Sequence, residues 1–188
     1  MQLSQAYQWL IQGPSRHLII TKLLQPMTAK QLARKTDLDL DFCSYTLGEL
    51  AKHQLVSCLN PNANRSRLYW LTSLGKACQQ RGRGNLHLPP LIYEFPVVDW
   101  DLYGWICFNH RKAVIKALKV PMQPATIKRR AKFDDPDLRM SANNVRDVIR
   151  LFLQKKIVRP VQVKKKAHLR YELTEEGNML RQLLMNAD

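Results

Sequence analysis

The chain contains two copies of one pattern, and this internal repeat constrains its fold more than any other feature of the sequence. Residues 69–75 read Tyr-Trp-Leu-Thr-Ser-Leu-Gly and residues 171–177 read Tyr-Glu-Leu-Thr-Glu-Glu-Gly, so both have the form Tyr-x-Leu-Thr-x-x-Gly. Nearer the start of each copy, the pair Pro26-Met27 corresponds to Pro121-Met122. The repeat predicts two similar folding units of roughly 90 residues each.

The spacing of apolar residues predicts the same order of elements in both copies. In the first copy we expect helices over residues 2–12, 16–25, 29–35 and 39–54, strands over 56–59 and 68–71, and a helix from Thr72 to about residue 80. In the second copy we expect helices over residues 99–108, 111–119, 124–131 and 141–155, strands over 157–163 and 168–173, and a helix after Thr174. Residues 132–140 are expected to form an enlarged turn.

Three helices followed by a two-stranded hairpin and a last helix are typical of a winged helix–turn–helix. The predicted fold class is therefore mainly α with small β-hairpins (α+β), arranged as two tandem winged helix–turn–helix domains related by internal pseudo-symmetry. We expect the first domain at residues 1–82, a linker or strap at 83–98, and the second domain at 99–188.

Two segments of the first copy carry a family resemblance. Residues 55–61 and 67–76 resemble the wing and following helix of prokaryotic winged-helix transcriptional regulators in the broad MarR/ArsR-like group, and Thr28-x-x-Gln31-Leu32-Ala33 resembles the first helix of their helix–turn–helix. The resemblance implies a DNA-binding regulator, often dimeric. It also implies that the third helix of each domain enters the major groove while the wing contacts the backbone.

The charge of the chain favours a polyanionic partner. Thirty Lys and Arg residues face fifteen Asp and Glu residues, which gives a net charge of +15. Such an excess favours phosphate-rich partners because their neutralisation releases counterions. Double-stranded DNA is the first expectation, and an anionic membrane surface is a distant second.

The predicted recognition helix of the second copy is rich in groups that read bases. Asparagine pairs with adenine and arginine with guanine, and positions three and four apart share a helix face. The expected base-reading residues are Asn143, Asn144, Arg146, Asp147 and Arg150. The alternative is an ordinary solvated helix face.

Cationic side chains elsewhere are expected to contact the DNA backbone. In the second copy these are Lys128, Arg129 and Arg130 on the preceding helix, and Lys164, Lys165, Lys166, His168 and Arg170 on the hairpin. In the first copy they are Arg65 and Arg67.

The first copy departs from this pattern. Its recognition helix opens with Asp37, Asp39 and Asp41, which repel phosphate, and with apolar Leu40 and Phe42. We therefore expect the second domain to dominate base readout. The first domain is expected to contribute a surface for a homodimer or a partner protein.

No motif for catalysis is recognisable. Histidines and cysteines lie at no metal-ligand spacing, and phosphate loops and nucleophile elbows are lacking in the sequence. We expect no enzyme activity, no metal site and no cofactor. The N-terminus lacks the layout of a signal peptide and no apolar run would span a membrane, so the expected location is cytoplasmic, with the nucleoid.

The sequence therefore predicts sequence-specific binding of double-stranded DNA, as in a transcriptional regulator. Three alternatives stay open. One is a replication, partition or mobile-element protein that uses the same fold on DNA. Another is a winged-helix scaffold for protein–protein interaction. The third is an RNA-binding protein.

Overall fold

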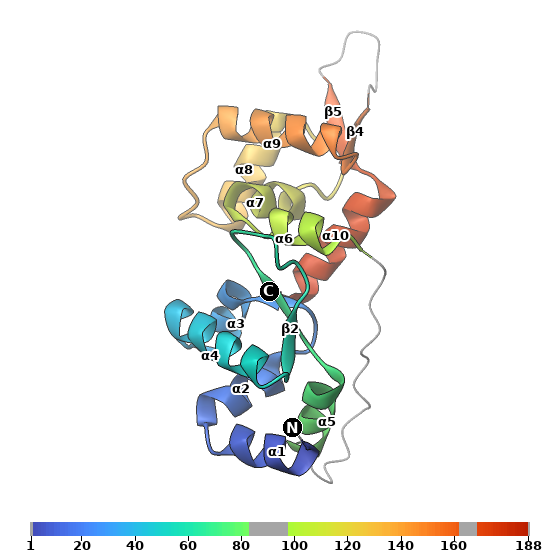
Figure 1. Ribbon diagram of the computed structural model, residues 1–188. Helices are drawn as coiled ribbons and strands as arrows, with labels where there is room; N and C mark the ends of the chain where they lie inside the picture. Colours follow the sequence, from blue (N-terminus) through green and yellow to red (C-terminus); the bar gives the residue numbers. More distant parts are fainter. Residues whose placement is uncertain (1, 83–97, 162–168, 188) are drawn as a thin grey trace. The chain divides into compact units, whose positions relative to one another are not determined.

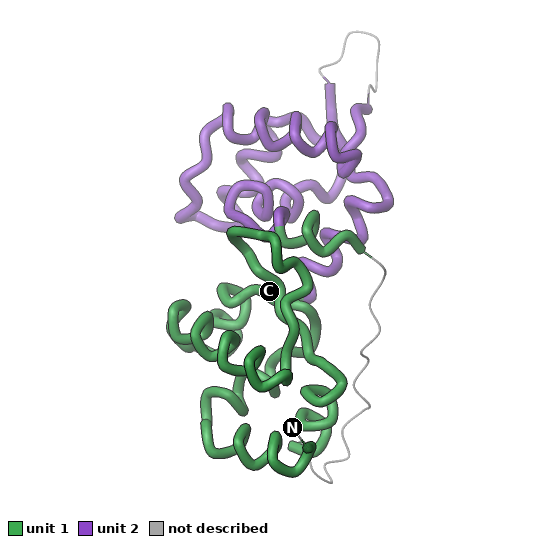
Figure 2. The backbone as a smooth tube through the Cα atoms, in the orientation of Figure 1, with its two compact units in different colours: residues 1–104, 187–188 green, residues 105–186 purple. Residues whose placement is uncertain are grey.

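The computed structural model describes residues 2–82, 98–161 and 169–187, which are mainly helical with small antiparallel sheets (Figure 1). This confirms the predicted α+β class. The chain divides into two compact units (Figure 2): unit 1 is Met1–Gly104 with Ala187–Asp188, and unit 2 is Trp105–Asn186. Among the described residues, no helix has the length and apolar character needed to cross a membrane.

Unit 1 begins with helices that pack around α2. The helices and strands in chain order are α1 (Leu3–Ile11), α2 (Pro14–Lys22), β1 (Met27–Thr28), α3 (Ala29–Thr36), α4 (Leu40–Lys52), β2 (Val56–Cys58), β3 (Leu68–Leu71) and α5 (Ser73–Gly82). Helix α2 contacts α1, α3, α4 and α5. The sheet has the order β1-β3-β2, with both outer strands antiparallel to β3.

Local capping chemistry fixes where these helices begin. The Thr28 side chain accepts a hydrogen bond from the Gln31 N–H at 3.2 Å, while the Gln31 side chain accepts from the Thr28 N–H at 2.9 Å, so the predicted capping box is confirmed. Asp39 caps α4 by accepting from the N–H groups of Asp41 and Phe42. Asp37 has a positive φ of 56° between α3 and α4, which completes a tight turn.

The core of unit 1 consists of the inward faces of these helices and of β3. Cys43, Leu47 and Leu50 of α4 are fully buried, as their spacing predicts. The buried Gln79 side chain of α5 donates to the carbonyl oxygens of Ile20 at 2.5 Å and Leu23 at 3.1 Å. These bonds satisfy carbonyl groups at the C-terminal end of α2 that the helix itself leaves open.

Unit 2 repeats the same order. Its elements are the end of α6 (Trp100–Ile106), α7 (Asn109–Ala117), α8 (Pro124–Asp134), α9 (Ala142–Gln154), β4 (Val158–Val161), β5 (Arg170–Leu173) and most of α10 (Glu175–Ala187). Helices α7, α8 and α9 pack pairwise on one another. Strands β4 and β5 are antiparallel, and Met122 forms a bridge to Tyr171 in the place that β1 takes in unit 1.

The repeated Thr-x-x-Gly pattern makes the same contacts twice. Thr72 Oγ1 donates to the Gln54 carbonyl oxygen at 2.6 Å and accepts from the Gly75 N–H at 3.1 Å. Thr174 Oγ1 donates to the Lys156 carbonyl oxygen at 2.8 Å and accepts from the Gly177 N–H at 3.1 Å. The repeated residues therefore join the end of α4 to the start of α5, and the end of α9 to the start of α10.

Several predicted boundaries differ from the structure by two or three residues, for example the ends of α2 at Lys22 and of α6 at Ile106 and both ends of α7. Two further differences have a local cause. The second helix starts at Pro14, not at residue 16, because proline suits the first helical position and Gly13 precedes it as N-cap. Helix α8 runs on to Asp134, where an enlarged turn was expected from residue 132. The ion pair between Arg130 and Asp134, one turn apart at 3.1 Å, favours this extension.

Candidate nucleic-acid interface

Helix α9 separates its polar and apolar side chains onto two faces. Val145, Val148, Ile149 and Phe152 are buried in the core of unit 2. Four of the five predicted base-reading residues are exposed on the other side, namely Asn143, Arg146, Asp147 and Arg150. The period of the helix therefore brings these four side chains together, as the spacing predicts.

The exposed side chains of α9 are held in two pairs. Arg146 Nη1 donates to Asn143 Oδ1 at 3.0 Å, and Arg150 Nη1 donates to Asp147 Oδ1 at 3.2 Å. Each arginine has five N–H donors, so most of each guanidinium stays available for another acceptor. Exposed pairs of this kind are worth about 1 kcal/mol or less, and a ligand can replace them.

Asn144 has a different position. It is half-buried, its Oδ1 accepts from the Ser141 N–H at 2.8 Å, and its own N–H donates to Ser141 Oγ at 3.1 Å. A bidentate contact with adenine uses both the oxygen and the nitrogen of the amide. The cap therefore competes with that contact for the amide oxygen of Asn144.

The predicted backbone residues of α8 differ in their surroundings. Arg129 is exposed, whereas Lys128 and Arg130 are half-buried. The Arg130 Nε lies 3.1 and 3.2 Å from the two carboxylate oxygens of Asp134. The charge of Arg130 is thus partly compensated, which leaves Lys128 and Arg129 as the stronger candidates for a phosphate contact.

On the hairpin of unit 2, the predicted residues Lys164, Lys165, Lys166 and His168 lie outside the described residues. Arg170 is exposed on β5. The sequence prediction missed Arg159, which is exposed on β4 and pairs across the strands with Glu172 at 2.6 Å between Nε and Oε1. Its position next to the buried Val158 was the available signal, because neighbouring residues of a strand point to opposite faces.

In unit 1 the loop between β2 and β3 is organised by buried Asn60. Its Oδ1 accepts from the Leu68 N–H at 2.7 Å, and its Nδ2 donates to the Ser66 carbonyl oxygen at 3.2 Å. The predicted residues Arg65 and Arg67 are exposed on this loop, where Arg67 Nε donates to the Ala63 carbonyl oxygen at 3.1 Å.

Helix α4 exposes apolar and acidic groups at its start. Phe42 and Tyr45 are 45% and 66% exposed, and Leu40, Asp39 and Asp41 beside them are exposed as well. By the offset of the repeat, Phe42 corresponds to Asn144 and Tyr45 to Asp147. Helices α4 and α9 therefore present surfaces of different chemistry.

A tryptophan is covered by cations at the equivalent place in each copy. The Arg16 guanidinium lies 3.9 Å from the Trp9 ring centre, and His53 stacks on Trp9 at 3.7 Å. In unit 2, Arg111 and Lys155 lie 4.2 and 5.1 Å from the Trp105 ring centre. These tryptophans brace α2 against the end of α4 in unit 1, and α7 against the end of α9 in unit 2.

Metal-ligating side chains do not cluster anywhere in the described ranges. Burial raises the pKa of the Cys43 and Cys78 thiols, and burial lowers the pKa of Arg111. None of these three groups lies on the exposed face of α9.

Comparison of this chain with protein-family models, with curated proteins and with solved structures found no match.

Proposed function

We propose that the chain is a tandem winged helix–turn–helix protein that binds double-stranded DNA sequence-specifically and regulates transcription. Helix α9 reads bases in the major groove, and cationic residues of α8 and of the β4–β5 hairpin contact phosphates. The proposal involves no catalysis and no cofactor.

The exposed face of α9 is the observation that carries this proposal. Asn143, Arg146 and Arg150 lie along one side of a helix whose other side is buried in the core. A helix anchored in this way presents its side chains at fixed positions, as base reading requires. Asparagine and arginine are the side chains best suited to adenine and guanine edges.

The order of the elements gives further support. Helix α8 precedes α9 and carries Lys128 and Arg129, and the β4–β5 hairpin follows with exposed Arg159 and Arg170. In helix–turn–helix proteins the helix before the recognition helix crosses the DNA backbone. A net charge of +15 favours such a complex at long range.

Unit 1 fits a different role in the same protein. The acidic and aromatic start of α4 opposes phosphate, and the exposed Phe42 and Tyr45 favour contact with protein. We therefore assign base reading to unit 2 and assembly to unit 1.

The test is the anisotropy of a labelled random-sequence duplex, titrated with the full chain between about 50 and 200 mM salt. Binding that weakens steeply with salt is expected. The double variant Arg146→Ala, Arg150→Ala should weaken binding at least about tenfold, because it removes two charged contacts.

The matched control is Lys22→Ala with Lys119→Ala, which removes the same charge from exposed positions outside α9. This control should lose much less affinity. Equal losses in the two double variants would show that only net charge matters, and undiminished binding in both would rule out the interface. Duplex RNA as competitor separates DNA from RNA binding.

A further inference from the structure

Helix α9 carries one acidic residue, Asp147, on the face that the proposed function places against DNA. The Asp147 side chain is 60% exposed. A carboxylate in that position repels the phosphates of a duplex. Asp147 therefore lowers the affinity of this face for every DNA sequence alike.

The stability of the helix does not account for this acid. Asp147 is the sixth residue of α9, beyond the first turn in which the helix dipole favours acids. The start of the helix is capped by Ser141 together with Asn144. An exposed ion pair between residues three apart adds little to the stability of a helix.

Asp147 instead holds the arginine of the next turn. Arg150 Nη1 donates to Asp147 Oδ1 at 3.2 Å. This bond leaves the Nε–Nη2 edge of the guanidinium, whose two parallel N–H groups match the O6 and N7 acceptors of guanine. An arginine side chain that is already ordered loses less conformational entropy when it binds.

Given the proposed DNA binding, on which this inference rests, we infer that Asp147 is a positioning residue that directs Arg150 to a guanine. The duplex that the chain prefers thus has a G·C pair opposite Arg150. Asp147 itself touches no base. Its carboxylate lowers the affinity for all sequences and raises the preference for guanine at this one base pair.

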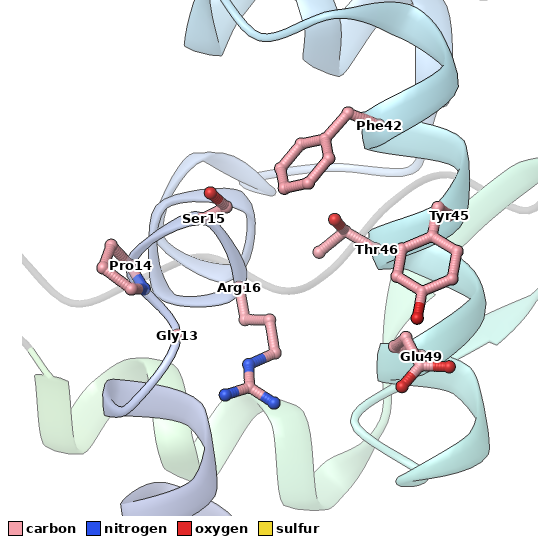
Figure 3. A pocket seen from close by; sticks show the side chains of 8 residues that line it. All are labelled: Gly13, Pro14, Ser15, Arg16, Phe42, Tyr45, Thr46 and Glu49. Atoms are coloured by element: carbon pink, nitrogen blue, oxygen red, sulfur yellow. The ribbon is translucent and has the colours of Figure 1, made fainter.

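Unit 1 lacks both residues of this pair. By the offset of the repeat, Asp147 corresponds to Tyr45 and Arg150 to Gly48. Tyr45 lines a cavity between the α1–α2 turn and α4 (Figure 3), and glycine has no side chain that could reach a base. The acid therefore occurs in the copy that has an arginine for it to hold.

The experiment starts with a duplex that the full wild-type chain selects from a random pool. The variant Arg150→Ala identifies the base pair at which the preference for guanine is lost. Asp147→Ala should relax the preference at that same base pair by about fivefold or more, the lower end for one bidentate contact. It should also bind random duplex about two- to fivefold more tightly, because it removes a charge that repels phosphate.

Two further variants separate positioning from direct reading. Asp147→Asn keeps an Oδ1 acceptor for Arg150, so it should preserve most of the preference although it binds random duplex as tightly as Asp147→Ala. In the Arg150→Ala background, Asp147→Ala should change the preference no further. A preference lost at a different base pair, or losses that add in the double variant, would show that Asp147 reads a base itself and would overturn the inference.

Glu172→Ala is the matched control. Glu172 pairs with Arg159 across β4 and β5 at 2.6 Å, so this variant also takes a carboxylate away from an arginine of unit 2, outside α9. Random and selected duplexes should then bind more tightly by the same factor, with the preference for guanine unchanged. If Glu172→Ala relaxes the preference as much as Asp147→Ala does, the assignment to Asp147 is wrong.

Wild-type binding separates this inference from the proposed function. A wild type that binds no duplex, or binds duplexes without base preference, overturns both. A wild type that binds its selected duplex with a preference that Asp147→Ala leaves intact overturns the positioning role alone.

Discussion

Gly75 lies directly against the carbonyl oxygen of Leu55, so closely that a β-carbon on Gly75 would overlap that oxygen. Gly177 has the same relationship to the carbonyl oxygen of Ile157. Helix α5 thus begins beside the segment that follows α4, and α10 begins beside the segment that follows α9. This close backbone approach explains why the repeated pattern ends in glycine.

The first prediction concerns this contact. Gly75→Ala and Gly177→Ala should each lower the free energy of unfolding by about 2–3 kcal/mol, because backbone on both sides must shift to admit the methyl group. Urea denaturation followed by circular dichroism measures the change.

Gly48 provides a matched control within α4. A β-carbon at Gly48 would meet no atom within 4 Å, so Gly48→Ala should raise the free energy of unfolding by about 0.5–1 kcal/mol. A destabilising Gly48→Ala, or a neutral Gly75→Ala, would contradict the proposed origin of the repeated glycine.

The order of helices and strands was predictable because the same sequence pattern occurs twice, so each copy supports the assignment of the other. Capping residues indicated where helices begin, namely Thr28 with Gln31, Thr72, and Ser141. Helix ends were harder to predict. The last turn of α8 contains the side-chain pair of Arg130 and Asp134, which apolar spacing does not reveal.

The second prediction concerns the tryptophan of unit 2. Arg111 lies 4.2 Å from the Trp105 ring centre, and burial lowers its pKa. A cation–π contact removed from water is worth up to about 2 kcal/mol. In a double-mutant cycle, Arg111→Ala and Trp105→Leu should therefore show a coupling energy of about 1–2 kcal/mol in urea denaturation. Additive losses would show that the two side chains merely pack.

Spacing on α9 predicted which side chains share an exposed face, but not how each is engaged. Asn143 and Asn144 are neighbours in sequence, yet one bonds to Arg146 and the other caps the helix. The hydrogen-bond partner of each asparagine depends on the conformation of its side chain, which the spacing of residues does not determine.

The third prediction concerns the buried cysteines. Burial raises the pKa of the Cys43 and Cys78 thiols above the ordinary value near 9. Because the folded pKa lies above the unfolded one, the contribution of these thiols to stability is full below about pH 9 and is lost as pH rises further. In native protein, a thiol reagent should modify half-buried Cys58 and Cys107 well before Cys43 and Cys78. Equal rates for all four would contradict this order.

The last prediction separates the two asparagines of α9. Asn144→Ala breaks the capping box with Ser141 and should lower the free energy of unfolding by about 1 kcal/mol. Asn143→Ala removes only an exposed bond to Arg146 and should change stability by less than about 0.5 kcal/mol. If Asn143 reads a base, its variant should instead bind a selected duplex more weakly and with relaxed preference at one base pair. Thermal unfolding and duplex titration of the same two variants measure both effects, and a pair of variants that behave alike in both assays would contradict the division of roles.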